Sequence, residues 1–195
     1  MTLTFRRLTP EHASSYRALM LEAYELHPDA FTSDAKEREA LPIDWWEKRL
    51  DSSPAATDVV FAALEGDHLL GVVGLSVETR KKASHKSTIF GMYVPLAHRN
   101  KGIGHKLMCG VLAYAKSQPQ LLVVQLTVTD GNGSAKVLYE RMGFVTFGLE
   151  PLAVAVGTQF VSKVHMWNDL RELSPQSPRT LIHHEPDAST LSSLF

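Results

Sequence analysis

A glycine-rich segment in the middle of the sequence is the part best suited to chemistry. It reads Arg99-Asn100-Lys101-Gly102-Ile103-Gly104 and lies between an apolar run ending at Val94 and a helical pattern beginning near Ile103. Glycines let a backbone approach a ligand closely, and the first N–H groups of a helix lack intrahelical partners. These donors, the helix dipole and the nearby cations favour a phosphate or pyrophosphate. The alternative is a turn that only connects strand to helix.

Two familiar phosphate-binding motifs do not fit this segment. A Walker A loop ends in Gly-Lys-Ser/Thr, whereas Gly104 is followed by His105-Lys106-Leu107. The dinucleotide-binding fingerprint requires a third glycine at the position of Leu107. A nucleotide-binding phosphotransferase is therefore not expected.

A second group of candidate residues follows one predicted strand later. Asn132 suits the cap of a predicted helix, and Ala135 and Tyr139 are four residues apart, so they share one face of that helix. A tyrosine hydroxyl with a pKa of about 10 stays protonated at neutral pH and can act as a proton donor. Packing beside Leu138 and Met142 is the alternative role for Tyr139.

Together the two segments resemble the signatures of the Gcn5-related N-acetyltransferases, the GNAT superfamily. Arg99, Gly102 and Gly104 match the pattern Arg/Gln-x-x-Gly-x-Gly/Ala that follows a strand in that family. Residues 132–144 reproduce the pattern Asn-x-x-Ala-x-x-x-Tyr-x-x-x-Gly-Phe. Either motif alone is weak, but both in this order, separated by a predicted helix and a buried strand, are specific. The resemblance covers about residues 3–170.

The resemblance implies an acetyl-CoA-dependent N-acetyltransferase that acts by direct attack of a primary amine in a ternary complex, without a metal. The pyrophosphate would lie on the backbone amides of the glycine-rich loop. The strand before that loop would bulge and splay from its neighbour, so that its backbone pairs with the pantetheine arm like an added strand. The coenzyme-binding residues implied are Met92, Tyr93, Val94, Arg99, Asn100, Lys101, Gly102, Ile103, Gly104, Asn132 and Ala135.

The same resemblance makes Tyr139 the general acid that protonates the departing thiolate. Some relatives place a glutamate at the start of the strand before the loop, but residues 83–87 here read Ala-Ser-His-Lys-Ser. His85, whose imidazole titrates near neutrality, and Glu78 on the preceding strand are the candidates for the base. Ordinary hairpin roles for both residues, with deprotonation of the amine through ordered water, are the alternative.

The resemblance implies an acceptor pocket walled by the first two helices, the segment that connects them and the later strands. Residues 22–47 in this region carry eight acidic and two basic side chains and hence a net charge of −6. Such a rim would attract a small cationic amine, and Tyr24, Phe31, Trp45 or Trp46 would offer it apolar or cation–π contacts. The alternative is that these charged side chains lie on solvated helix faces and have no role in binding. A protein N-terminal or lysine acetyltransferase, or a non-catalytic acyl-CoA-binding sensor, is the alternative function.

Hydropathy patterns predict the elements that would position these residues. Helices are expected near residues 10–24, 43–50, 103–115 and 133–142, and a loop or broken helix at 29–42. Strands are expected at residues 3–7, 59–64, 69–77, 87–94, 121–128, from 144, and at 159–167. This order predicts a mixed α/β domain of α+β character. The resemblance implies a GNAT fold, with a mostly antiparallel mixed sheet, splayed strands and about four helices.

Composition limits the remaining possibilities. The chain has 195 residues, a net charge of −1 and a single cysteine, which fits a GNAT domain at residues 1–170 followed by a Ser-, Pro- and His-rich tail at 171–195. The basic run at 80–86 lacks interleaved aromatics, so nucleic-acid binding is not expected. Neither a bilayer-spanning stretch nor an apolar leader is recognised, and a cytoplasmic protein, with a homodimer as a candidate assembly, is expected. The His183-His184 pair in the tail is interpreted as solvated.

Overall fold

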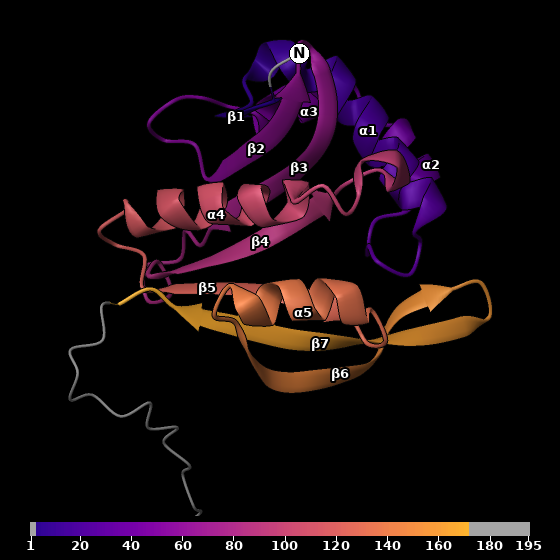
Figure 1. Ribbon diagram of the computed structural model, residues 1–195, viewed down its shortest axis with the longest axis vertical. Coiled ribbons are helices and arrows are strands. Elements are labelled where there is room, and N and C mark those ends of the chain that lie inside the picture. The colour runs from indigo at the N-terminus through magenta and orange to yellow at the C-terminus, as the bar shows by residue number, and fades with distance from the viewer. Residues whose placement is uncertain (1–2, 172–195) are drawn as a thin grey trace, which may run out of the picture.

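The computed structural model describes residues 3–171, and the predicted tail with its histidine pair lies almost wholly outside them (Figure 1). The strands are β1 (Leu3–Arg7), β2 (Asp58–Glu65), β3 (His68–Val77), β4 (Lys86–Tyr93), β5 (Val123–Thr129), β6 (Val145–Val156) and β7 (Gln159–Asp169). The helices are α1 (Ala13–Leu26), α2 (Ala35–Glu39), α3 (Ile43–Arg49), α4 (Ile103–Lys116) and α5 (Gly133–Arg141). Short 3-10 turns occupy Pro10–His12 and Leu96–His98.

One seven-stranded sheet forms the centre of the domain, in the order β1-β2-β3-β4-β5-β7-β6. Every neighbouring pair is antiparallel except β4 and β5, which are parallel. Helices α4 and α5 lie on one face of the sheet and α1 to α3 on the other (Figure 1). This arrangement confirms the mixed, mostly antiparallel α/β fold expected from the sequence.

Helix α2 is the short helical piece within the segment predicted as a loop or broken helix. Its start is set by Asp34, whose carboxylate accepts hydrogen bonds from the backbone N–H groups of Lys36 at 2.9 Å and Glu37 at 3.2 Å. Such an N-cap satisfies donors that a helix leaves unpaired. The domain therefore has one α-helix more than the predicted order of elements.

The sheet opens between its two parallel strands. Residues 86–88 of β4 pair with residues 123–125 of β5, and no pairing between the two strands continues beyond Thr88 and Gln125. On the other side of β4, Val72 lies opposite Tyr93 and Gly74 opposite Phe90, so β4 carries one extra residue. That bulge includes Gly91, whose φ of +59° lies in a region that L side chains rarely adopt. The structure thus has the splay and the bulge that the family resemblance implied.

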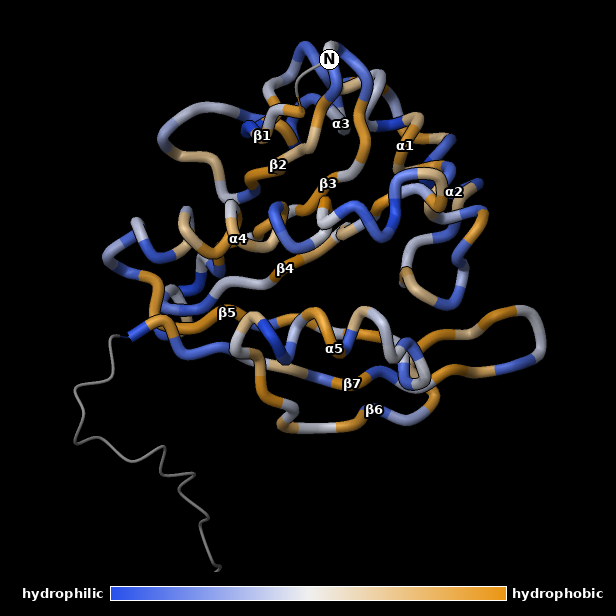
Figure 2. The backbone as a smooth tube through the Cα atoms, in the orientation of Figure 1, coloured by the Kyte–Doolittle hydropathy of each residue, from blue (hydrophilic) through white to orange (hydrophobic). Residues whose placement is uncertain are grey.

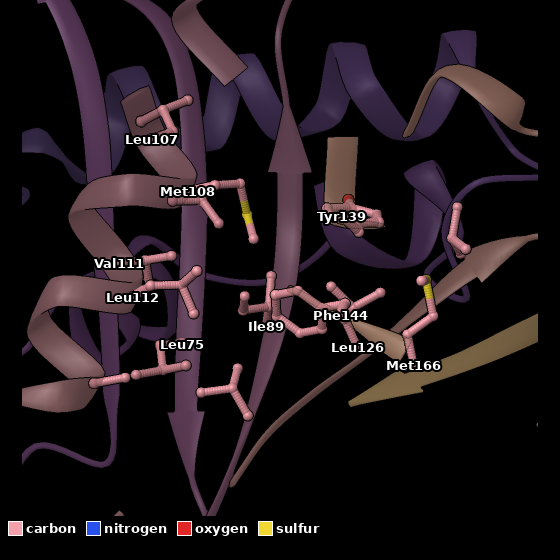
Figure 3. Close-up of a cluster of buried hydrophobic side chains, with 14 of the residues drawn as sticks. Leu75, Ile89, Leu107, Met108, Val111, Leu112, Leu126, Tyr139, Phe144 and Met166 are labelled. Atoms are coloured by element: carbon pink, nitrogen blue, oxygen red, sulfur yellow. The ribbon is translucent and has the colours of Figure 1, made fainter. Parts of the chain in front are cut away.

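Two apolar cores hold the layers together, and one of them continues across the split. Apolar residues are concentrated along the central strands, whereas the outer loops are largely polar (Figure 2). Under α4 and α5, Leu107 and Met108 pack in one cluster with Ile89 of β4 and Leu126 of β5 (Figure 3). Burial of such a side chain contributes about 1.5–3 kcal/mol, so this cluster keeps the two halves of the sheet together although their strands diverge.

Candidate active site

A cavity of about 680 Å³ occupies the gap between β4 and β5. Its walls come from five regions of the chain: the loop after α1, the diverging strands, the turn into α4, α5, and β7. The lining includes His27, Asp29, Phe31, Phe90, Gly91, Met92, Tyr93, Val94, Arg99, Asn100, Gly102, Ile103, Gly104, Leu126, Thr129, Asn132, Ala135, Leu138, Tyr139 and Lys163. Most of the site residues predicted from sequence therefore meet in one cleft.

The N-terminus of α4 presents backbone donors to this cleft. Gly102 is the N-cap residue, with a φ of +75°, and no side chain among residues 3–171 caps the helix there. The first intrahelical bond runs from the Lys106 N–H to the Gly102 carbonyl, so the preceding amides are free to bind a ligand. Asn100, at a φ of +61°, completes the left-handed turn. These features fit a phosphate group on the positive end of the helix dipole.

Arg99 is held by the protein on the cleft wall. Its Nε donates to the Val94 carbonyl at 2.9 Å, and its Nη2 donates to Nε2 of His27 at 2.9 Å. The side chain thus connects the end of α1, the end of β4 and the turn before α4. Lys101, by contrast, is exposed and does not line the cleft.

Helix α5 places Tyr139 on the opposite wall. The Asn132 side chain accepts a hydrogen bond from the Ala135 N–H at 3.2 Å and so caps the helix as predicted. Tyr139, one turn beyond Ala135, is 7% exposed and packs on Phe144 (Figure 3). Burial raises the pKa of its hydroxyl to about 12. Within residues 3–171 that hydroxyl has no hydrogen-bond partner, so it is free to donate to a bound group.

A second tyrosine also lines the cleft, but its hydroxyl is occupied. Tyr93 donates to the Glu22 carboxylate at 2.8 Å, and burial together with this bond raises its pKa to about 12. The two tyrosines therefore differ in the property that matters for a proton donor, because Tyr139 alone of the pair keeps a free hydroxyl.

The sequence profile of the Acetyltransferase (GNAT) family matches residues 20–144. The chain belongs to this family. Among solved structures, a GNAT-family acetyltransferase from Streptococcus pneumoniae is similar, with 24% identity, a TM-score of 0.76, and coverage of 86% of this chain and 99% of the other. The putative acetyltransferase yncA from Salmonella typhimurium, solved with acetyl-CoA, has 18% identity and a TM-score of 0.73 over 91% and 98%.

A third similar structure is NAA60 from Arabidopsis thaliana in complex with a bisubstrate analogue. It shares 19% identity and a TM-score of 0.65, over 86% of this chain and 98% of the other. No curated protein matches the sequence. At these identities the solved structures establish the fold, and the family match establishes a GNAT acetyltransferase.

The two base candidates lie outside the main GNAT cleft. Glu78 lines a second cavity, of about 550 Å³, that shares Thr88 and Phe90 with the first. Its carboxylate pairs with Arg80 at 2.5 Å, and these bonds lower its pKa to about 2, which makes it a weak proton acceptor. His85 precedes β4 and lines neither cavity.

The acidic segment 22–47 contributes less to the GNAT cleft than its charge suggests. Of its eight acidic residues, Asp29 lines the cleft, and of the four aromatics named for the acceptor, Phe31 does. Trp46 is fully buried, and Trp45 lies under the guanidinium groups of Arg38 and Arg49. This wall of the cleft therefore has one carboxylate and one partly buried ring from this segment.

Sequence reasoning missed Lys163 and Thr129, which also line the cleft. A single lysine within the apolar run of residues 160–167 was the available signal. Within the described residues, no group of three or more potential ligands gathers around a metal position, and no helix there has the length and apolarity to cross a membrane.

Proposed function

We propose that this protein transfers the acetyl group of acetyl-CoA to the primary amine of a small cationic acceptor, by direct attack within a ternary complex. The observation that carries the proposal is a single cleft lined both by the uncapped amides of α4 and by the free, protonated hydroxyl of Tyr139. A diphosphate and a thioester sulfur are the two groups of one ligand that such a cleft suits.

The donor is held mainly by backbone. Residues 100–104 supply N–H groups to the pyrophosphate, with Asn100, Gly102, Ile103 and Gly104 on the cleft wall, whereas the Arg99 N–H already donates to the Leu96 carbonyl at 3.3 Å. Residues 92–94 lie where β4 has left β5, so their backbone groups on that side are available to the pantetheine arm. Asn132 and Ala135 give the arm a close approach to α5.

The chemical step needs a neutral amine and a proton for the leaving sulfur. As the neutral amine attacks, its nitrogen bonds to the thioester carbon, the carbon–sulfur bond breaks, and the sulfur takes the proton of the Tyr139 hydroxyl. The new amide nitrogen gives up one proton to water, and water returns a proton to the Tyr139 oxygen. The same burial that raises the pKa of Tyr139 also disfavours a thiolate beside it, which keeps proton transfer feasible. Tyr139 is therefore proposed as the general acid.

Removal of a proton from the acceptor ammonium, which must precede its attack as a neutral amine, is assigned to ordered water in the cleft. Glu78 and His85 are retained as the two side chains to test, because Glu78 borders the adjoining cavity and His85 directly precedes β4. The low pKa of Glu78, which its pair with Arg80 causes, argues against a role as the base.

A small cationic acceptor is supported by the charges on the acceptor side. Asp29 lines the cleft and forms no ion pair within the described residues, whereas Asp58 and Glu78 in the adjoining cavity are already paired with Arg49 and Arg80. A protein N-terminus or lysine is the second candidate acceptor, and an acyl-CoA-binding sensor the non-catalytic alternative.

We further propose a cytoplasmic protein. A homodimer is proposed through edge strand β6 and its hairpin with β7, where Phe147, Leu149 and Phe160 are exposed (Figure 1).

The test combines calorimetry with a thiol-release assay. The full chain should bind acetyl-CoA and CoA, and it should release free thiol with at least one member of a panel of amino acids, polyamines and N-terminal or lysine-containing peptides. Turnover with peptides alone would select the protein acceptor, and binding without turnover on any amine would select the sensor. Absence of binding to either form of the coenzyme would contradict the proposal as a whole.

A further inference from the structure

Lys163 is a buried cation on the wall of the cleft. It lies on β7, is 3% exposed, and lines the cavity together with its neighbour on β5, Thr129. Lysine is among the side chains least often buried, because its ammonium loses hydration there. A position that keeps one needs partners for all three of its N–H groups.

Those partners are three oxygens. Lys163 Nζ donates to the carbonyl of Asp29 at 3.0 Å, to the carbonyl of Ala30 at 2.9 Å and to Oγ1 of Thr129 at 2.8 Å. The Thr129 hydroxyl in turn donates to the Asp29 carbonyl at 2.7 Å. The donors of the ammonium are thus fully used, mostly on the backbone of a loop more than 130 residues away in sequence.

This network joins the two sides of the split sheet at its open end. The loop between α1 and α2, residues 27–34, extends from a helix that packs on the half of the sheet containing β4. Thr129 and Lys163 belong to the other half, and Thr129 is four residues beyond the last pairing of β5 with β4. The cleft therefore has a cross-link on its acceptor side, where Asp29, Phe31 and Thr32 form its wall.

Packing alone does not account for a charged group here. Burial lowers the pKa of Lys163, and the groups that bond to it directly are carbonyls and a hydroxyl, with the Asp29 carboxylate acting on it only through its charge. Replacement of a buried ion pair by apolar side chains of similar volume is often neutral or stabilising in proteins, so a buried charge is weak evidence for a contribution to stability. A lysine at this position is thus better explained by the loop it holds than by its contribution to stability.

We propose that Lys163 is a positioning residue, which clamps the backbone of residues 29–32 across the open end of the cleft and so fixes the wall against which the acceptor amine approaches. The inference rests on the proposed function for its consequence in catalysis. The clamp itself is a property of the protein without any substrate. The two parts can therefore be tested separately.

The experiment compares Lys163→Met with Lys116→Met, which removes one charge from the exposed end of α4. In the substrate-free protein, amide hydrogen exchange in residues 27–34 should accelerate about 10-fold or more in Lys163→Met and remain unchanged in Lys116→Met. With the best amine of the panel, the KM for the amine should rise about 10-fold in Lys163→Met, while the affinity for CoA stays within about threefold.

Thr129 supplies a second pair of variants that leaves the lysine in place. Thr129→Val keeps the shape and removes the hydroxyl, so it should give a smaller change in the same direction, whereas Thr129→Ser should restore wild-type exchange and KM. This pair decides the question if Lys163→Met does not fold. The clamp is overturned if amide exchange in residues 27–34 of Lys163→Met matches that of wild type. If Lys163→Met does not fold, wild-type exchange in Thr129→Val overturns the clamp instead. Both outcomes can be measured without an amine substrate. Faster exchange with an unchanged KM overturns the role in acceptor positioning, and failure of the wild type to bind CoA would separately contradict the proposed function.

Discussion

The donor side and the acceptor side of the cleft present different kinds of groups to a ligand. On the donor side the groups are mainly backbone: the amides at the start of α4 and the unpaired edge of β4 beyond residue 88. On the acceptor side they are side chains on a loop that Lys163 and Thr129 hold in place. A backbone site needs only the right φ and ψ angles, so it suits a ligand common to a whole family. A side-chain wall can differ between members, and we propose that this wall selects the acceptor.

The largest effect is expected from Tyr139→Phe. Loss of the proton donor should lower kcat about 100-fold, while CoA affinity stays within about threefold, because the ring and its packing remain. Tyr114→Phe is the matched control, since Tyr114 packs against Phe61 outside the cleft. Steady-state kinetics with calorimetry check the result, and an unchanged kcat would remove Tyr139 from the mechanism.

A smaller effect, confined to the donor side, is expected from Gly102→Ala. A left-handed conformation costs an L residue about 1–2 kcal/mol, so the turn should shift and CoA binding should weaken about 10-fold. Gly110→Ala, on the same helix with open space around its Cα, should instead stabilise the protein by about 0.5–1 kcal/mol without altering binding. Calorimetry and thermal unfolding measure both. Equal CoA affinity in the two variants would mean that the Gly102 conformation does not shape the site.

A change confined to the acceptor side is expected from Asp29→Asn. The KM for a cationic amine should rise about three- to fivefold at low ionic strength, and the difference should shrink as salt is added. Glu37→Gln, on the exposed part of α2, is the control for loss of one negative charge. Initial rates across a salt series provide the measurement, and a KM equal to that of wild type at low salt would count against electrostatic attraction of the acceptor.

The smallest effects are expected from titration of the site. Because burial disfavours the phenolate, Tyr139 with its pKa of about 12 should stay protonated, and kcat should not decline between pH 9 and 10.5, where an ordinary tyrosine would ionise. Because the Arg80 guanidinium holds the pKa of Glu78 at about 2, Glu78→Gln should change kcat less than about threefold and remove no limb of the pH–rate profile above pH 4. A pH–rate profile of both proteins is the check. A large loss of kcat in Glu78→Gln would identify it as the base.

Local signals in the sequence predicted most of the donor side. Gly102 stands where a left-handed residue begins a helix, and Asn132 caps the helix that carries Tyr139, so the structural requirement and the residue that meets it lie within a few positions of each other. The strands followed from runs of apolar residues. The bulge at Gly91 came from the family resemblance, because no local pattern distinguishes a bulged glycine from one in a regular strand.

The acceptor side could not be predicted in the same way. The number of acidic residues in 22–47 does not say which of their side chains face the cleft. In the folded protein Asp29 lines the cleft, whereas Asp34 caps a helix and Glu22 binds Tyr93. The sequence alone determined the strands, every α-helix of residues 3–171 except α2, the order of these elements and the family motifs, since these depend on neighbouring residues. Tertiary structure decided where β4 leaves β5 and which loop Lys163 holds, because those contacts join parts of the chain whose approach depends on the packing of the whole sheet.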